Sequence, residues 1–319
     1  MPITTDALPF LSGDEIRRAV PITDVLDVVE AAYRDVATGR DRSPQRIHVP
    51  MDGGDLLLMP GIRAGASGFS VKLVTVVAEN AARGLPTVQA VVVWFDAASG
   101  RPTALIDGPT LTAMRTGAAS GVATRLLART DASVTAIIGA GAQAEWQLRA
   151  VLAARPIRHF LVYARTPDAR EAFARRMALE VGVEIVAVQS AEEAVRAADV
   201  VCCATTSSTP VFDAAWLGDG AHVNGVGAFR LGMVELPSEL FGRASIVAVD
   251  SREAAMAEAG DLVAAIQRGF VREDALVEIG SVDPSWVAGR PADAITVFKS
   301  VGLAIQDVAA AELIVSRLL

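Results

Sequence analysis

The spacing of apolar residues divides the chain into two regions of different character. In the first region, Ser12 and Glu15 have the spacing of a capping box, so a short helix is expected to begin there. Apolar residues then recur at helical spacing over residues 22–36, which predicts a longer helix. Between residues 47 and 107 the pattern changes to short apolar or β-branched runs, separated by Gly, Pro and Asn. These runs predict a mostly antiparallel sheet packed on the first helices, with strands at 56–59, 69–78, 88–96 and 102–106.

The second region alternates between helical and strand periodicity. A helix of small residues is predicted over 110–128, and because its Ala and Gly side chains permit close packing, it is expected to cross between domains. After it, apolar strand-like runs alternate with helical segments, which is typical of a parallel, doubly wound sheet. We expect strands at 134–138, 160–163, 185–188, 200–204, 222–226, 246–249 and 295–298, and helices at 143–153, 167–179, 191–197 and 301–318, the last capped by Ser300.

The order of these elements predicts an α/β protein with two domains. Residues 115–299 are expected to form a Rossmann-type domain with a doubly wound parallel sheet. Residues 1–114 are expected to form a second, smaller α+β domain. The C-terminal helix at 300–319 is expected to complete this smaller domain.

The most specific local motif is Gly-Ala-Gly-Ala-Gln-Ala, which starts at Gly139. It follows the predicted strand at 134–138 and opens a helix, the context in which a glycine-rich turn binds a dinucleotide. Gly139 can form the tight turn, and Gly141 lets backbone amides approach a pyrophosphate. The helix N-terminus, with Ala142 and Gln143, would then face the phosphates. The motif therefore predicts a nicotinamide dinucleotide site.

The end of the next strand bears on the choice between NAD(H) and NADP(H). An Asp or Glu at this point would bind the ribose diol of NAD. The strand is instead followed by Arg165 and Thr166, and then by Arg170. Guanidinium and hydroxyl groups suit a 2′-phosphate, although Thr166 could equally be an ordinary helix cap. The sequence favours NADP(H), with NAD(H) as the alternative.

Composition and charge exclude several classes of protein. With 52% apolar and 21% charged residues, the chain is typical of a folded globular protein and not of a disordered one. Its formal net charge of −8 disfavours binding to nucleic acid or to an anionic membrane surface. No apolar run is long enough for a membrane helix, and no signal-peptide pattern is found at the N-terminus.

The rarer residue types narrow the chemistry further. The only cysteines, Cys202 and Cys203, are adjacent and cannot form a disulfide framework, so a cytoplasmic protein is expected. The three histidines lie far apart in the sequence, and no metal site is expected. One of them, His222, lies in a predicted strand, where a structural imidazole is the simpler interpretation.

Lysine is rare, because 27 of the 29 basic residues are Arg. Lys72 and Lys299 are therefore candidates for a role that Arg cannot fill, since a desolvated Lys can lose its proton near neutral pH. Lys72 lies in a run otherwise suited to a buried strand, where a charged group needs an anionic partner or ligand. Arg46 and Arg115 are the other candidate cations, and each could instead be an ordinary salt-bridged side chain. Lys299 precedes the last helix and could face either the cofactor or solvent.

Taken in order, segments along nearly the whole chain resemble the ornithine cyclodeaminase/μ-crystallin family. Each segment alone is a weak signal, but the ordered set is specific. The segments are Gln45-Arg46, Leu58-Met59-Pro60, Val71-Lys72-Leu73-Val74, Asn80 with Gly84-Leu85-Pro86-Thr87, Met114-Arg115-Thr116-Gly117-Ala118, the glycine-rich turn from Gly139 to Gln143, Val223-Asn224-Gly225-Val226-Gly227 and Phe298-Lys299-Ser300-Val301-Gly302.

The resemblance implies a homodimer whose first domain binds a small carboxylate substrate and forms the dimer contact. It implies that Arg46 and Lys72 hold the substrate carboxylate and take part in catalysis, and that Phe229 and Val301 lie beside the substrate. A guanidinium group suits such a ligand, because it can bind a carboxylate in a bidentate manner. The residues implied to line the cofactor, besides the glycine-rich turn, are Thr87, Arg115, Thr116, Thr205, Val226 and Ser300.

One departure from the family pattern bears on the reaction. Ornithine cyclodeaminases and some related amino-acid dehydrogenases carry an Asp just after the segment that resembles Val226-Gly227, and that Asp acts as a base. Phe229 stands in its place here, and a phenyl ring cannot accept a proton. The sequence is therefore most similar to the ketimine and Δ1-pyrroline-2-carboxylate reductases, which lack the Asp. Glu235, the nearest downstream acid, is an alternative source of a carboxylate.

The expected function is NAD(P)H-dependent reduction of a cyclic imino acid, namely Δ1-pyrroline-2-carboxylate or Δ1-piperideine-2-carboxylate, to proline or pipecolate. Lys72, or a water that it holds, is expected to supply the proton. Three alternatives stay open on the sequence alone. They are ornithine cyclodeamination, oxidation of an open-chain amino acid by a dehydrogenase, and non-enzymatic binding of a small ligand by a nucleotide-loaded protein.

Overall fold

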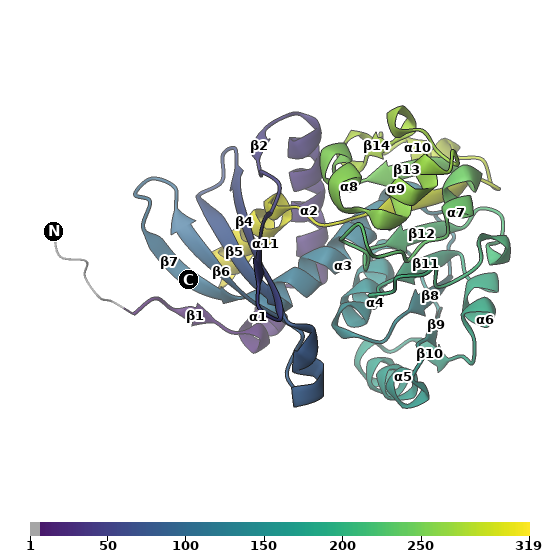
Figure 1. Cartoon of the computed structure of the whole chain (residues 1–319), viewed down its shortest axis with the longest axis horizontal. Coiled ribbons are helices and arrows are strands. Elements are labelled where there is room, and N and C mark those ends of the chain that lie inside the picture. Colours follow the sequence, from purple (N-terminus) through teal and green to yellow (C-terminus); the bar gives the residue numbers. More distant parts are fainter. Residues whose placement is uncertain (1–6) are drawn as a thin grey trace. The chain divides into compact units, whose positions relative to one another are not determined.

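The computed structural model describes residues 7–319, and these residues form two compact units. The first unit ends at Arg115 and also contains the C-terminal segment Leu303–Leu319, and the second runs from Thr116 to Gly302. Helix α3 (Gly108–Leu127) contains the boundary between them. Each unit has its own sheet (Figure 1).

The sheet of the first unit is mostly antiparallel, as the sequence predicts. Its strand order is β1-β7-β6-β5-β4-β2, and β3 also pairs with β4. Among the described strands, only β1 and β7 pair in parallel within this sheet. The strands are β1 (Phe10–Leu11), β2 (Asp41–Arg42), β3 (Ile47–Met51), β4 (Gly54–Arg63), β5 (Gly68–Val76), β6 (Val88–Asp96) and β7 (Pro102–Asp107).

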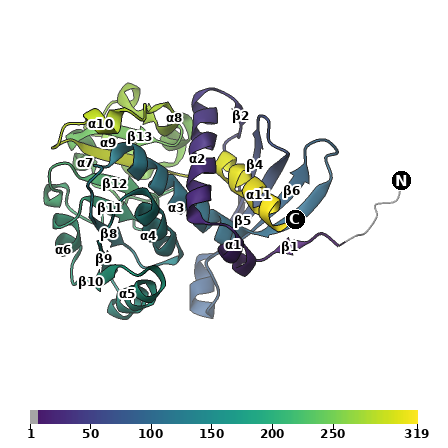
Figure 2. The ribbon, with the colours of Figure 1, turned by 180° about the vertical axis from the view of Figure 1, so that it is seen from behind.

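Helices α1 (Gly13–Ala19), α2 (Ile22–Ala37) and α11 (Ala304–Leu318) belong to the same unit. The capping box is confirmed, because the Ser12 side chain accepts from the Glu15 amide while Glu15 accepts from the Ser12 amide. Helix α11 packs across β4 and β5, and α2 packs against α11 (Figure 2). Burial alternates along β5, so Lys72 lies on the face that α11 covers.

The sheet of the second unit is parallel throughout its described strands, which confirms the Rossmann-type prediction. Its order is β10-β9-β8-β11-β12-β15-β13-β14. Helices α4 and α6 lie on opposite sides of it (Figures 1 and 2). The strands are β8 (Val134–Ile138), β9 (His159–Tyr163), β10 (Glu184–Ala187), β11 (Val200–Cys203), β12 (His222–Gly225), β13 (Ala244–Val249), β14 (Val277–Glu278) and β15 (Ile295–Lys299).

Most differences from the sequence prediction are short helices of this unit. Three helices of the unit were predicted, namely α4 (Ala142–Ala154), α5 (Pro167–Val181) and α6 (Ala191–Arg196). Four short helices were not predicted, namely α7 (Ser238–Arg243), α8 (Arg252–Glu258), α9 (Gly260–Gln267) and α10 (Trp286–Gly289). Helices of four to eight residues span only about one to two turns, so they show little periodicity.

The predicted start of the last helix is also wrong. Helix α11 begins at Ala304, and Ser300 does not cap it. The Ser300 hydroxyl instead donates to Asp250 Oδ2 at 2.9 Å.

Within the described residues, no helix combines the length and apolar character needed to cross a membrane. Among the same residues, no group of three or more potential metal ligands is found.

Candidate active site

A buried carboxylate in the first unit binds two of the predicted cations. Asp307, in the first turn of α11, lies with Oδ2 2.8 Å from Lys72 Nζ and with Oδ1 2.9 Å from Arg115 Nε. All three side chains are buried. Sequence analysis predicted that Lys72 needs an anionic partner, but it did not identify Asp307, which is separated from Lys72 by the whole second unit.

The electrostatic environment of Lys72 makes its proton available near neutral pH. Burial is the main cause that lowers the pKa of Lys72 from its ordinary value of 10.5 to about 7. The positive charges of Arg115 and Arg46 lower this pKa as well, whereas the carboxylate of Asp307 opposes them. The side chain can therefore both carry a positive charge and release a proton at physiological pH. Arg46 is half-buried just before β3.

Hydrogen bonds from α11 fix the geometry around Arg115. Arg115 Nη1 donates to Gln306 Oε1 at 3.1 Å, and the amide nitrogen of Gln306 donates to the hydroxyl of Tyr33 in α2 at 2.5 Å. The sequence-based expectation for Arg115 was contact with the cofactor. Its Nε and Nη1 atoms bind Asp307 and Gln306, so Arg115 links α3 to α11. Contact of Arg115 with the cofactor stays a prediction.

The glycine-rich turn of the second unit has the local geometry that a dinucleotide needs. Gly139 has φ of +112°, a backbone conformation that side chains rarely adopt, and a Cβ there would lie 2.8 Å from the Ala204 carbonyl oxygen. Gly141 is exposed at the N-terminus of α4 and has extended backbone, so the first amides of that helix point outward. Gln143 Oε1 is buried without a partner among the described residues. These features fit a bound pyrophosphate.

The three residues predicted to select the cofactor have different environments. Arg165 and Thr166 are exposed directly after β9. Arg170 is buried, and it donates from Nη1 to the Ala164 carbonyl at 3.0 Å and from Nη2 to Gln189 Oε1 at 2.6 Å. Both terminal nitrogens of Arg170 thus bind protein atoms that support the turn, whereas Arg165 presents its guanidinium to solvent.

Glu235 joins the backbone segments that follow β11 and β12. Its Oε1 accepts from the Thr205 amide at 2.6 Å, and its Oε2 accepts from the Gly227 amide at 2.8 Å. The side chain is fully buried, and burial raises its pKa. Because both oxygens are used in this way, Glu235 is not free to supply the carboxylate that the family pattern lacks here. Val226, predicted to line the cofactor, is buried in the same segment.

Lys299 ends β15 in the interior of the second unit, so the solvent-facing alternative is wrong. Its Nζ donates to the Ala228 carbonyl at 2.7 Å and lies 3.3 Å from Asp261 Oδ2. The next residues are held by Asp250, which accepts from the Ser300 hydroxyl and from the amides of Val301 and Gly302. Ser300 and Val301 therefore lie in a segment of fixed geometry.

The remaining predicted positions show mainly structural contacts. Thr87 is half-buried, and its carbonyl accepts from the Val77 amide at 2.9 Å. Thr116 is buried, and its carbonyl accepts from the Gln147 side chain at 3.3 Å. His222 is a buried structural imidazole as expected, with Thr296 and Asn224 as partners, and burial lowers its pKa to about 3.

Comparison with known proteins settles the family. The sequence profile of the ornithine cyclodeaminase/mu-crystallin family matches residues 9–319. The chain belongs to this family. It is 38% identical, over 97% of its length and 96% of the relative's, to Delta(1)-pyrroline-2-carboxylate reductase from Bacillus cereus.

Two solved structures are similar over nearly the whole chain. One is Thermococcus litoralis Delta(1)-pyrroline-2-carboxylate reductase in complex with NADH and L-proline, with a TM-score of 0.91, 36% identity and 97% coverage of both chains. The other is an archaeal alanine dehydrogenase dimer with bound NAD, with a TM-score of 0.87, 32% identity and coverage of 97% and 95%.

Within the ornithine cyclodeaminase/mu-crystallin fold, Phe229 marks the departure noted in the sequence. It follows β12, is half-buried, and its ring lies 5.3 Å from the guanidinium carbon of Arg230. The Phe229 side chain has no group that can donate or accept a proton. Glu235 binds backbone amides and Asp261 pairs with Lys299.

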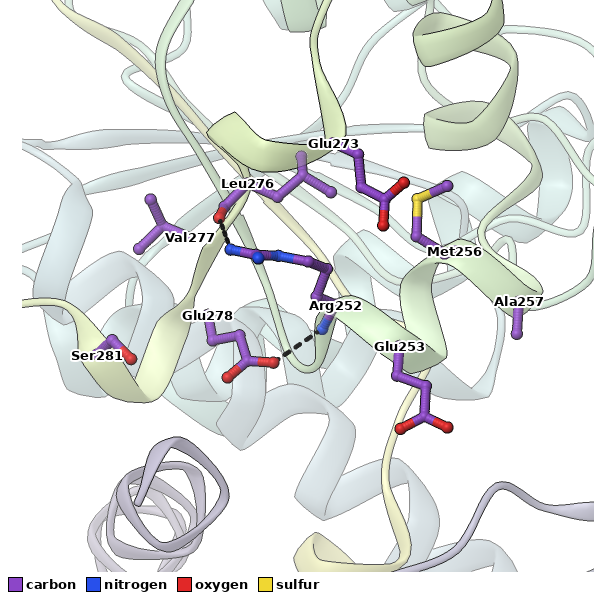
Figure 3. A pocket seen from close by; sticks show the side chains of 9 residues that line it. All are labelled: Arg252, Glu253, Met256, Ala257, Glu273, Leu276, Val277, Glu278 and Ser281. Carbon is purple, nitrogen blue, oxygen red and sulfur yellow. Dashed lines mark hydrogen bonds between the residues drawn. The ribbon is translucent and has the colours of Figure 1, made fainter. Parts of the chain in front are cut away.

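A separate hollow on the second unit is unsuited to a carboxylate substrate of this family. It has a volume of about 980 Å³ and lies beside α8 and β14, where Glu253, Glu273 and Glu278 surround it (Figure 3). Arg252, the one cation among the nine described residues that line it, donates to the Leu276 carbonyl at 2.8 Å. The three carboxylates would repel an anionic ligand. The features described above therefore remain the candidate active site.

Proposed function

We propose that the chain is an NAD(P)H-dependent reductase of cyclic imino acids, with Δ1-pyrroline-2-carboxylate or Δ1-piperideine-2-carboxylate as substrate. The observation that carries the proposal is the buried Lys72–Asp307 pair, because it combines a positive charge with a pKa near 7. The glycine-rich turn at Gly139 and the identity to pyrroline-2-carboxylate reductases support the same reaction.

The proposed chemistry needs few functional groups from the protein. Arg46 and Lys72 bind the substrate carboxylate, and Lys72 gives one proton to the ring nitrogen of the C=N bond. When bound, NAD(P)H supplies the hydride that reduces the carbon of that bond. Asp307 holds the ammonium group in place and favours its protonated form. Since no water has to be activated, the phenyl ring at Phe229 is no obstacle.

We propose NADPH as the preferred cofactor and NADH as a second one. The exposed Arg165 and Thr166, at a strand end without an acidic residue, suit the 2′-phosphate. Both terminal nitrogens of Arg170 already bind protein atoms, namely the Ala164 carbonyl and Gln189 Oε1. We therefore assign Arg170 no direct contact with the phosphate. The two similar solved structures contain NADH or NAD, which is why we propose NADH as the second cofactor.

We propose a homodimer formed through the sheet face of the first unit that α11 does not cover. Phe69, Val71 and Leu73 of β5 lie on this face and are only half-buried. Apolar residues of neighbouring strands continue it, and Ile47 and Val49 of β3 are exposed to 54% and 42%. A contiguous apolar surface of this kind is typical of a protein contact.

The proposed reaction predicts a specific pattern in an assay of the purified protein. NADPH or NADH should be oxidised with Δ1-pyrroline-2-carboxylate or Δ1-piperideine-2-carboxylate, with proline or pipecolate as product. Release of ammonia and proline from ornithine without added reductant would instead identify a cyclodeaminase. Reduction of NAD(P) by alanine without imine reduction would identify a dehydrogenase. Binding of cofactor and proline without any turnover would identify a non-enzymatic binding protein.

A further inference from the structure

Three buried charged residues in the second unit form one connected network. Glu235 binds the amides of Thr205 and Gly227, and Lys299 binds the Ala228 carbonyl and pairs with Asp261. Asp261 Oδ2 also accepts from the Leu236 amide at 3.3 Å. All three charged side chains have 0% exposure. Burying three charges is costly unless each has a specific partner, and here each has at least two.

The network links the same two backbone segments twice. The first link is direct, from the Gly227 amide to the carboxylate of Glu235. The second runs from the neighbouring Ala228 through Lys299 and Asp261 to the amide of Leu236, the residue after Glu235. Segment 227–228 is thus held against segment 235–236 by two parallel paths, and it has little freedom to move.

The segments after β11 and β12 are in direct backbone contact at this point. A Cβ on Gly227 would lie 2.0 Å from the Thr205 carbonyl oxygen and 2.6 Å from Glu235 Oε1. Only a glycine therefore fits, and Glu235 satisfies both of the amides that face it. The carboxylate of Glu235 fixes how closely the two strand ends approach each other.

The place of these segments in the sheet indicates which part of the cofactor they serve. In a doubly wound sheet the dinucleotide lies across the carboxyl ends of the strands, with its two halves on either side of the first strand. The glycine-rich turn follows β8, and the exposed Arg165 follows β9 on the adenosine side. Strands β11 and β12 lie on the other side of β8, which is the nicotinamide side.

We propose that Glu235, Lys299 and Asp261 position the nicotinamide half of the cofactor site, and that the adenosine half does not depend on them. The inference rests on the cofactor use in the proposed function. The three residues act through the backbone of residues 205 and 226–229, so they are positioning residues and not catalytic ones. Burial raises the pKa of Glu235, and the charge of Lys299 opposes this effect, which is consistent with the close coupling of the network.

Two variants test the network with side chains of similar size to the original ones. Glu235→Gln keeps the shape of the side chain but turns one of its two acceptors into a donor that faces a backbone amide. Lys299→Met combined with Asp261→Asn removes the bond to Ala228 and leaves the net charge of the network at −1, as in the parent protein. The matched control is Thr296→Val, which removes a buried partner of His222 on the same strand β15 at its opposite end.

The measurement compares ligands with and without the nicotinamide ring. Dissociation constants are determined for NADPH and 2′-phospho-ADP-ribose, and for NADH and ADP-ribose. We expect both network variants to raise the dissociation constants of NADPH and NADH about 10-fold or more, and those of the two ligands without a nicotinamide ring less than about 2-fold. We expect the control to leave the ratio between the two classes of dissociation constant unchanged. Equal weakening of all ligands, or no change in any, would overturn the inference.

The result also separates this inference from the proposed function. If the parent protein binds NADPH but reduces no imine, the proposed reaction fails while the binding ratio still decides the inference. If the parent protein reduces the imine and the variants show no selective loss, only the inference fails. If the parent protein binds neither reduced cofactor, both fail together.

Discussion

The Nζ atom of Lys72 lies 2.8 Å from Oδ2 of Asp307, and both side chains are buried. The two residues come from separate segments of the first unit's sequence, one from β5 and one from α11. Asp307 also binds Arg115, so one carboxylate serves two cations and leaves the group with net positive charge. Such a charge is costly in the interior unless an anion is bound, which favours a carboxylate ligand.

Replacement of Lys72 by Arg separates charge from proton supply. Lys72→Arg keeps a cation near Asp307 but removes a group that can lose its proton near neutral pH. We expect kcat for imine reduction to fall about 100-fold, within the range for loss of general-acid catalysis. Binding of pyrrole-2-carboxylate should be retained as the control for carboxylate recognition. A variant with the parental kcat would show that Lys72 is not the proton source.

The pH profile should report the ionisation of Lys72. Its pKa is lowered to about 7, so the protonated form that the reduction needs is lost as the pH rises through this value. We expect kcat/KM for the imine to fall above about pH 7. Asp307→Asn removes the carboxylate that opposes this lowering, so the falling limb should move to lower pH and activity at pH 8 should drop about 10-fold.

A second buried carboxylate provides the control for that shift. Asp35→Asn removes the partner of Arg63 and Arg40 in the same unit, away from the contacts of Lys72. This variant should lose stability but keep the pH profile of the parent protein. If the falling limb of the pH profile were unchanged in Asp307→Asn, the role assigned to Asp307 would be contradicted.

Cofactor preference should depend on Arg165. Charge-assisted hydrogen bonds contribute about 1.5–3 kcal/mol, so Arg165→Ala should raise KM for NADPH about 10-fold or more. KM for NADH should change less than about 2-fold, because the 2′-phosphate is absent. Arg175→Ala, at an exposed position on α5, is the control. A similar loss for both cofactors in Arg165→Ala would argue against a phosphate contact.

The side chain at position 229 should control whether water can be activated. The parent protein is expected to release no ammonia from ornithine, and Phe229→Asp should produce release at least about 10-fold above that background by restoring a base. Phe229→Leu, which is apolar and cannot accept a proton, should not. Rapid ornithine breakdown by the parent protein would refute the assignment of the reaction to imine reduction.

The uncovered face of the first unit's sheet should determine the oligomeric state. Leu73→Lys places a charge on this face, and we expect light scattering after gel filtration to show monomers in place of dimers. Leu179→Lys is a suitable control, because Leu179 is 90% exposed on α5 and its replacement should not affect association. A monomeric parent protein would rule out the proposed dimer.

The sequence predicted those features whose signal is local. The turn at Gly139 is recognisable because its glycines, the preceding strand and the following helix occupy one short stretch. Lys72 was singled out because a charge in an apolar strand run requires a partner. Its partner Asp307 was missed because no motif connects positions 72 and 307. The signal available was an acid within the apolar run 304–311, which implies a buried cation elsewhere.

Residues whose partners are backbone atoms were the hardest to interpret. Glu235 binds the amides of Thr205 and Gly227, and such contacts depend on how the strand ends come together in three dimensions. Arg170 looked suited to a phosphate, yet it binds the Ala164 carbonyl and Gln189. Lys299 seemed able to reach solvent, but β15 lies between β12 and β13 inside the sheet.

The return of the chain to its first unit has a consequence for biosynthesis. Asp307 is translated only after the entire second unit has left the peptidyl-transferase centre, so the nascent first unit contains Lys72 and Arg115 without their counter-ion. Domains generally fold as units during synthesis. The strand β15, which lies between β12 and β13, directly precedes α11 in the sequence, so the sheet of the second unit is also completed only near the end of synthesis. The cationic centre forms last, because Asp307 lies in the final helix.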